Sequence, residues 1–198
     1  MMRVLIGGVG YRNLRDHSFG VVLVDSLAAQ TWPPGVSVED VSYNPIAVVQ
    51  RLEDDPADAR FDLAIIIGAL QRPGRIPGTL AVYRWDNVLP SDDSVHEAIT
   101  EAVTGIISLD NTLVVARYFK ALPATVVVVE IEPDAHESGD TLTPAVAEAL
   151  ESAREVVTLL ARQPATAERI PEGALAAERA RHTGVVFGQV IHGASRIH

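Results

Sequence analysis

Short apolar runs alternate along the chain with longer segments in which apolar residues recur every three or four positions. The short runs are rich in β-branched residues and lie next to turn-forming residues, which is typical of β-strands. We predict five strands: Arg3 to Ile6, Val36 to Val41, Leu63 to Ile67, Thr79 to Trp85 and Thr125 to Ile131. The third and fifth of these runs are almost wholly apolar, as expected for strands that are covered on both faces.

The longer segments have the spacing of amphipathic helices. We predict four helices: Phe19 to Ala29, Pro45 to Leu52, Ser108 to Ala121 and Thr143 to Leu160. Strands that alternate with helices predict an α/β fold, a three-layer sandwich in which helices cover both faces of a central five-stranded, mostly parallel sheet. Because the composition shifts toward Pro, Ala and Glu after residue 162, we assign residues 1–162 to this domain and interpret residues 163–198 as a linker and C-terminal extension.

Composition and charge narrow the class of protein. The chain has 198 residues, of which 47% are hydrophobic and 21% charged, the balance of an ordinary globular protein. Its formal net charge of −10 argues against binding to nucleic acid or to an anionic membrane, and the lack of cysteine excludes disulfides and thiolate metal sites. The apolar run near the N-terminus is too short for a signal-peptide core, and no run is long enough to span a membrane, so we expect a cytoplasmic protein.

The stretch from Ile6 to Gly20 (IGGVGYRNLRDHSFG), between the first predicted strand and the first predicted helix, carries the most chemical information. Gly8 and Gly10 allow a tight turn at the carboxyl end of a strand, where open α/β sheets bind their ligands. A dinucleotide-binding fingerprint would need a third glycine where this chain has Asn13, so the motif gives only weak support for nucleotide binding.

Residues 11–18, which we call the hook, place ionisable side chains at the same edge of the sheet. Asp16 and His17 could act as metal ligands or as an acid–base pair. The alternative is structural, with Asp16 capping the next helix and His17 half-exposed. The residue types alone leave both interpretations open.

Four segments occur in an order and spacing that are informative together. They are the Gly-x-Gly turn and hook followed by Phe-Gly-Val, the strand from Asp62 followed by Pro77-Gly78-Thr79, the segment LDNTLVVARYFKALP followed by VVVVEIEP, and Leu-Thr-Pro-Ala-Val at residues 142–146. In this combination the chain resembles the hydrogenase maturation protease family, whose members usually begin with a strand followed by GxGNxLxxDDGxG. The resemblance covers about the first 160 residues.

The resemblance implies a metal-guided endopeptidase that trims the C-terminus of the large subunit of nickel–iron hydrogenases once nickel is installed. It also implies that the partner is the large-subunit precursor and that the substrate carries the nickel. We therefore expect no tightly bound cofactor in the isolated protein.

The family's metal ligands are an acidic residue in the hook, an aspartate after the third strand and a histidine before the fourth helix. Transferred by position, the hook ligand falls on His17, with Asp16 retained beside it, and the aspartate falls on Gly68. The histidine falls near Gly105 when counted back from the proline that precedes the fifth strand, and closer to His96 when counted forward from the Pro-Gly-Thr segment. Because glycine offers no ligand, the family's set is degraded.

From this transfer Asp16 and His17 are the candidate catalytic residues. The candidate metal ligands are the same two residues and His96, although His96 could equally be an exposed residue at the start of a helix. We expect Gly8, Gly10 and Gly68 to line the cleft. The replaced ligands leave a second function open, that of a non-catalytic binding or assembly protein on the same fold.

Overall fold

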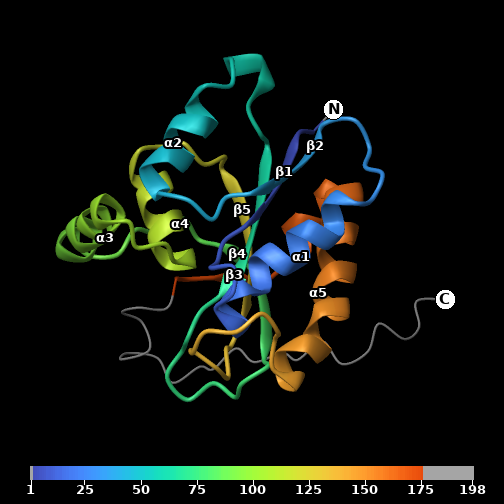
Figure 1. Cartoon of the computed structure of the whole chain (residues 1–198). Helices are drawn as coiled ribbons and strands as arrows, with labels where there is room; N and C mark the ends of the chain where they lie inside the picture. Colours follow the sequence, from blue (N-terminus) through green and yellow to red (C-terminus); the bar gives the residue numbers. More distant parts are fainter. Residues whose placement is uncertain (1, 176–198) are drawn as a thin grey trace.

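A computed structural model describes residues 2–175 of the chain (Figure 1). Its sheet has six strands in the order β2-β1-β3-β5-β4-β6, and all neighbours are parallel except β4 and β5. The strands are β1 (Val4–Gly8), β2 (Val36–Asp40), β3 (Leu63–Ala69), β4 (Leu80–Trp85), β5 (Thr125–Ile131) and β6 (Glu172–Gly173). The α/β class and the mostly parallel sheet are confirmed, and the sheet gains one short strand beyond the five that were expected.

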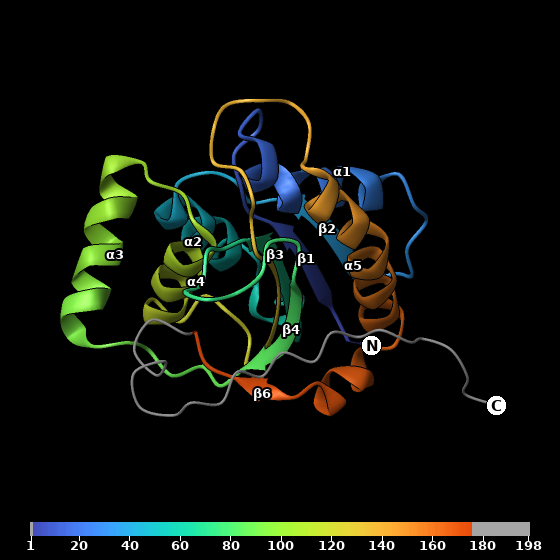
Figure 2. The same ribbon diagram turned by 90° about the horizontal axis from the view of Figure 1, so that it is seen from below.

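Helices cover both faces of this sheet (Figure 2). They are α1 (Phe19–Ala28), α2 (Pro45–Glu53), α3 (Asp92–Thr104), α4 (Leu109–Tyr118) and α5 (Pro144–Arg162). Helices α1 and α5 lie on one face, and α2, α3 and α4 lie on the other. Helix α3 was not among the predicted helices, because it buries only Val95, Ala98 and Ala102 and so lacks a broad apolar face.

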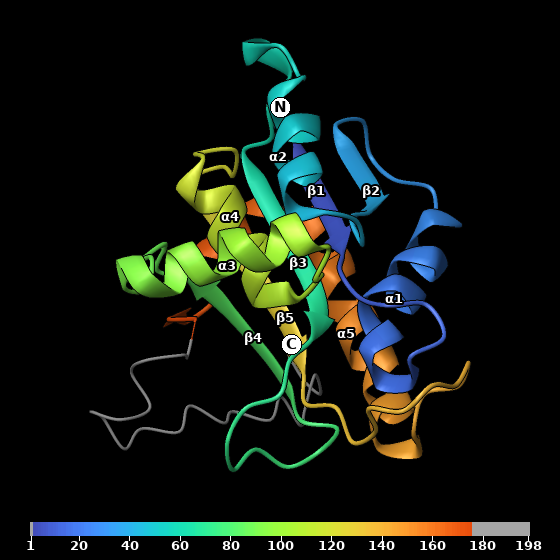
Figure 3. The same ribbon diagram turned by 60° about the vertical axis from the view of Figure 1, so that its left-hand side comes forward.

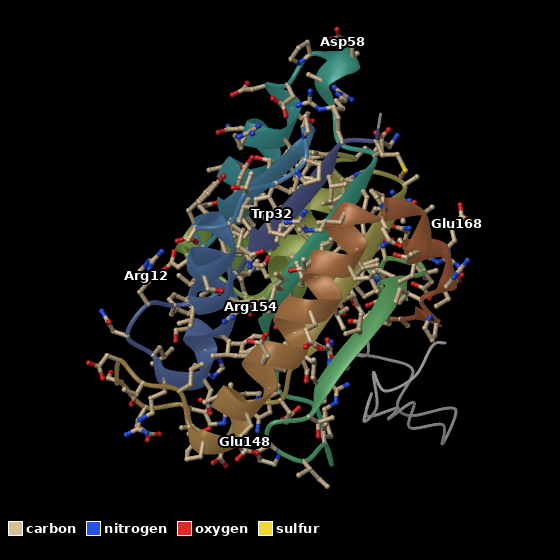
Figure 4. All side chains as sticks on the ribbon, turned by 90° about the vertical axis from the view of Figure 1, so that its right-hand side faces the viewer. Arg12, Trp32, Asp58, Glu148, Arg154 and Glu168 are labelled. Carbon is tan, nitrogen blue, oxygen red and sulfur yellow. The ribbon has the colours of Figure 1, made fainter. Side chains whose placement is uncertain are left out.

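The core consists of two layers of side chains separated by the sheet. Along β3, Leu63, Ile65 and Ile67 point to the layer beneath α1 and α5, whereas Ala64 and Ile66 point to the layer beneath α2 and α4. This alternation follows the two-residue period of a strand and explains why the run is apolar throughout. Figure 4 looks onto the face formed by α1 and α5, where polar residues such as Glu148 remain exposed.

The first part of the predicted C-terminal extension lies against the domain. A 3-10 helix (Pro164–Arg169) packs on α5, and β6 pairs with the end of β4, where Arg84 and Glu172 form an ion pair of 3.0 Å. The rest of the extension, residues 176–198, lies outside the described residues, and the boundary at residue 162 stays a prediction.

Within residues 2–175, no single helix has both the length and the apolar character needed to cross a membrane. Helices α3 and α4 meet those criteria only when taken together, and they are bent by 109° relative to each other.

Candidate functional site

The turn between β1 and the hook depends on two glycines. A Cβ atom at Gly8 would collide with the carbonyl oxygen of Gly20, and one at Gly10 would collide with the carbonyl oxygen of His17. Both positions therefore allow the backbones of β1, the hook and α1 to approach closely. Gly8 packs against α1, whereas Gly10 lies at the carboxyl edge of the sheet and lines a cavity there.

Asp16 is fully buried and binds the loop between β5 and α5, residues 132–143, which we call the β5–α5 loop. Its carboxylate accepts hydrogen bonds from the backbone amides of Asp134, Ala135 and Thr143 at 2.7–3.0 Å, and from the Thr143 hydroxyl at 2.8 Å. Three of these hydrogen bonds go to Oδ2 and one goes to Oδ1. Asp16 therefore joins the hook to the β5–α5 loop, and it makes no capping hydrogen bond to α1.

The hydrogen bonds of Asp16 also determine its charge. Burial raises the pKa of the carboxyl group, but the hydrogen bonds from Thr143, Asp134 and Ala135 lower it by more, so the pKa lies below its usual value. Asp16 is consequently an anion at neutral pH.

The hook and the β5–α5 loop lie side by side (Figures 2 and 3) and share further contacts. The backbone amide of Arg15 donates to the carbonyl oxygen of Gly139 at 2.9 Å, and the amide of Gly139 donates to that of Asn13 at 3.0 Å. The Arg15 guanidinium also lies 3.1 Å from the carboxylate of Glu137. Asn13 and Arg15 have positive φ angles of 63° and 38°, an unusual conformation that these contacts hold in place.

His17 meets His136, a residue of the β5–α5 loop that the sequence analysis did not identify. The Nε2 atom of His17 lies 2.8 Å from the Nδ1 atom of His136, so one ring donates a hydrogen bond and the other accepts it. Burial lowers the pKa of His17, positive charge on His136 lowers it further, and the negative charge of Asp16 opposes both effects, leaving a net decrease. The neutral form of His17 is thus favoured at this position.

The histidine pair lies where two cavities meet. The hook cavity has a volume of about 200 Å³ and is lined by Val9, Gly10, Tyr11, His17, Ala69, Leu70, Gln71, Ile107, Ser108 and Leu109. The loop cavity has a volume of about 440 Å³ and is lined by Gln71, Arg72, Pro73, Gly74, Arg75, Pro77, Glu132, Pro133, Asp134 and His136. His17 belongs to the first cavity, His136 belongs to the second, and Gln71 lines both. A ligand that occupies both cavities would pass the histidine pair.

The other predicted site residues lie in different surroundings. Gly68 is close to the hook cavity, because a Cβ atom there would lie 3.1 Å from the carbonyl oxygen of Val9 and 3.2 Å from the Cβ of Leu109, both of which line it. His96 lies on α3, where its Nδ1 atom is 2.8 Å from the carbonyl oxygen of Asp92. It lines neither of the two cavities described above, and Gly105 ends α3 with a φ angle of 85°. Among residues 2–175 no group of three or more His, Asp or Glu side chains is arranged to hold a metal ion.

A buried cluster of ionised side chains supports the loop cavity. Glu130 on β5 is 1% exposed and accepts hydrogen bonds from Arg72, Arg75 and the hydroxyl of Tyr83. Arg72 also binds both carboxylate oxygens of Asp110, at the start of α4, at 3.2 Å. Burial raises the pKa of Asp110, and the positive charge of Arg72 partly offsets that increase. The cluster fixes the segment after β3 against β5 and α4.

We expect replacement of Tyr83 by phenylalanine to lower the free energy of unfolding by about 1.5 kcal/mol, because the change removes a hydrogen bond to a buried carboxylate. Tyr118→Phe is a matched control, since Tyr118 is an exposed tyrosine on α4. Urea denaturation followed by circular dichroism measures both variants. Equal stabilities of the two variants would contradict a contribution of the Tyr83 hydroxyl to the cluster.

Comparison with solved structures places this architecture among known proteins. The hydrogenase-maturating endopeptidase HybD from E. coli is 25% identical over 85% of this chain and 94% of its own, with a TM-score of 0.59. The solution structure of an endopeptidase from Escherichia coli is also 25% identical, over 80% of this chain and 93% of its own, with a TM-score of 0.57. The [NiFe] hydrogenase maturation protease HybD from Thermococcus kodakarensis is 19% identical over 81% and 99%, with a TM-score of 0.55, a likeness of fold alone.

No protein-family model and no curated protein sequence matches the chain. The assignment therefore rests on the structural neighbours together with the turn, hook and helix-opening motifs described above. With this fold along most of its length and 25% identity to two of these endopeptidases, the chain resembles the hydrogenase maturation proteases as a divergent member of that family would.

Proposed function

We propose that this chain acts in the maturation of a nickel–iron hydrogenase, as an endopeptidase that binds the C-terminal segment of a large-subunit precursor. The observation that carries the proposal is the pair of adjoining cavities at the carboxyl edge of the sheet, with His17 and His136 between them. Open α/β sheets bind ligands at this edge, and two cavities joined by Gln71 suit an extended peptide better than a compact small molecule. We further propose a cytoplasmic location, where such precursors are made.

The three-ligand set implied by the family does not fit the residues present. Gly68 has no side chain to offer, and all four hydrogen bonds of the Asp16 carboxylate go to the β5–α5 loop. Of the hook residues, Tyr11 and His17 line the hook cavity, and of these two His17 is the one at a position that the family resemblance assigns to a metal ligand. We therefore derive no cleavage step through a resident metal. In this proposal His17 contacts the bound segment, and Asp16 is a positioning residue that holds the hook.

The altered ligands favour a second candidate function, in which the protein binds the precursor without cleaving it. Peptide cleavage depends on accurate placement of the polarised carbonyl group, and a site that lacks one carboxylate places it poorly. Binding depends on the cavities, whose lining includes Gly10 and Pro77 of the motifs described above.

Incubation with a hydrogenase large-subunit precursor tests both functions. We expect the unmodified protein to bind the precursor and to process it slowly, and His17→Ala to abolish processing because the substitution removes the imidazole that lines the hook cavity. Binding is measured by co-purification and processing by a gel shift of the precursor, with His96→Ala as the control variant. Binding without any product would support the second function, and failure to bind any nickel-loaded precursor would contradict both.

A further inference from the structure

We propose that His17 and His136 together form a two-imidazole site for a divalent transition-metal ion such as nickel. The inference deepens the proposed function and rests on it, because it identifies the residues that would contact the metal carried by the precursor. His136 comes from the β5–α5 loop, so this ligand pair differs from the set transferred from the family.

The two ring nitrogens lie just inside the separation that a shared ion requires. Imidazole nitrogens lie about 2.0–2.1 Å from such an ion, and two adjacent ligands are then about 2.9–3.4 Å apart, depending on the coordination geometry. The observed distance between His17 Nε2 and His136 Nδ1 is 2.8 Å, and the ring centroids are 5.1 Å apart. Rotation of each ring away from the line that joins the two nitrogens, with a slight increase in their separation, would let the two lone pairs converge on one ion.

The protonation change is simple. In the hydrogen bond one ring carries its proton on the nitrogen that faces its partner. When a metal binds, that ring adopts its other tautomer, with the proton on the far nitrogen, so both facing nitrogens become ligands and both rings stay neutral. Imidazole in this state suits nickel, copper and zinc.

The surroundings favour a cation and leave room for further ligands. The buried carboxylate of Asp16, which directly precedes His17 in the chain, provides a fixed negative charge near His17. The cations around the histidine pair are themselves paired with carboxylates. Arg15 of the hook pairs with Glu137, and Arg72 and Arg75, which line the loop cavity, pair with Glu130. Because His17 and His136 line different cavities, a peptide that extends through both would bring its own donors to the same ion. Two protein ligands alone give weak affinity, and donors from the substrate would complete the coordination.

Residues that are not metal ligands hold the two histidines in position. Asp16 and the backbone contacts at Gly139 hold the hook against the β5–α5 loop, so the two histidines face each other before any metal arrives. Such preorganisation lowers the cost of bringing ligands together.

Titration of the full chain with Ni²⁺ by calorimetry tests the site without any precursor. His182, His192 and His198 are first replaced by glutamine, so that each of the remaining histidines can be compared. We expect His17→Ala and His136→Ala each to weaken Ni²⁺ binding by at least about tenfold, while the control His96→Ala leaves it unchanged. Electron paramagnetic resonance with Cu²⁺ as probe should show coupling to two imidazole nitrogens, reduced to one in either variant.

The proposal is overturned if Ni²⁺ binding is insensitive to His136→Ala or if the Cu²⁺ spectrum shows no imidazole nitrogen. A variant that loses metal binding but keeps the circular dichroism spectrum of the unmodified protein supports the proposal, since the loss is then not due to unfolding. Failure of this test is distinguishable from failure of the proposed function, because precursor binding is measured separately and does not use free metal.

Discussion

Replacement of Asp16 by alanine is expected to lower the free energy of unfolding by about 3–5 kcal/mol at neutral pH, because it leaves two buried backbone amides and one part-buried amide without their acceptor. Thr143→Val, which removes only the hydroxyl donor, should cost less, about 1.5 kcal/mol. Asp25→Ala serves as the control, since Asp25 is an exposed aspartate and should change stability little. Urea denaturation at neutral pH measures all three variants, and an unchanged midpoint for Asp16→Ala would contradict the structural role assigned to this carboxylate.

The same experiment has a defined pH dependence. The pKa of Asp16 in the folded protein lies below its value in the unfolded chain, so the carboxylate stabilises the fold fully above the unfolded value. That contribution is lost as the pH falls from the unfolded pKa through the folded one. The stability difference between the unmodified protein and Asp16→Asn should therefore shrink in acid below about pH 4. Asparagine keeps the size of the side chain, which separates charge from packing.

Introduction of a carboxylate at Gly68 is expected to raise the affinity for Ni²⁺ or Zn²⁺ by at least about tenfold, because it would add a third protein ligand to the proposed pair of histidine ligands. The new side chain would emerge between Val9 and Leu109 at the wall of the hook cavity, which His17 also lines. The Cβ atom requires shifts of a few tenths of an ångström in those neighbours.

Gly68→Ala is the matched control for that variant, because it introduces the same Cβ atom without the carboxylate. Calorimetric titration of Gly68→Asp and Gly68→Ala, each with and without His17→Ala, shows whether the gain depends on the histidine. Equal affinities of the Asp and Ala variants would contradict the view that position 68 faces the metal-binding part of the cavity.

The sequence predicted the fold well where local pattern and burial agree. The apolar run at Leu63–Ile67 is buried on both faces as expected. The predicted helix with a proline at its first position, residue 144, is present. The antiparallel direction of β4 was not predicted, because the direction of a strand depends on the path of the connection before it and not on its local sequence. The strand β6 was not predicted because it has only two residues. Helix α3 escaped prediction because little of its surface is apolar.

The site was predicted in part. The sequence analysis placed the hook and the preceding turn glycines at the ligand-binding edge of the sheet. His17 lines a cavity at that edge. His136 was missed, although a histidine shortly after a strand that ends at the same sheet edge was a usable signal. The partners of Asp16 could not be predicted from local sequence, because its hydrogen bonds reach residues 118–127 positions away. The buried cluster could also have been predicted from Glu130, because a single charged residue in an otherwise apolar strand needs a partner of opposite charge.

The contact between Asp16 and Thr143 has a consequence for synthesis of the protein. The two residues are 127 positions apart, so the hook cannot gain its buried hydrogen bonds until nearly the whole domain has emerged from the ribosome. Closing so long a loop is slow and entropically costly, which places assembly of the histidine pair among the late events of folding. A nascent or truncated chain can thus form much of the sheet while its cavities remain incomplete.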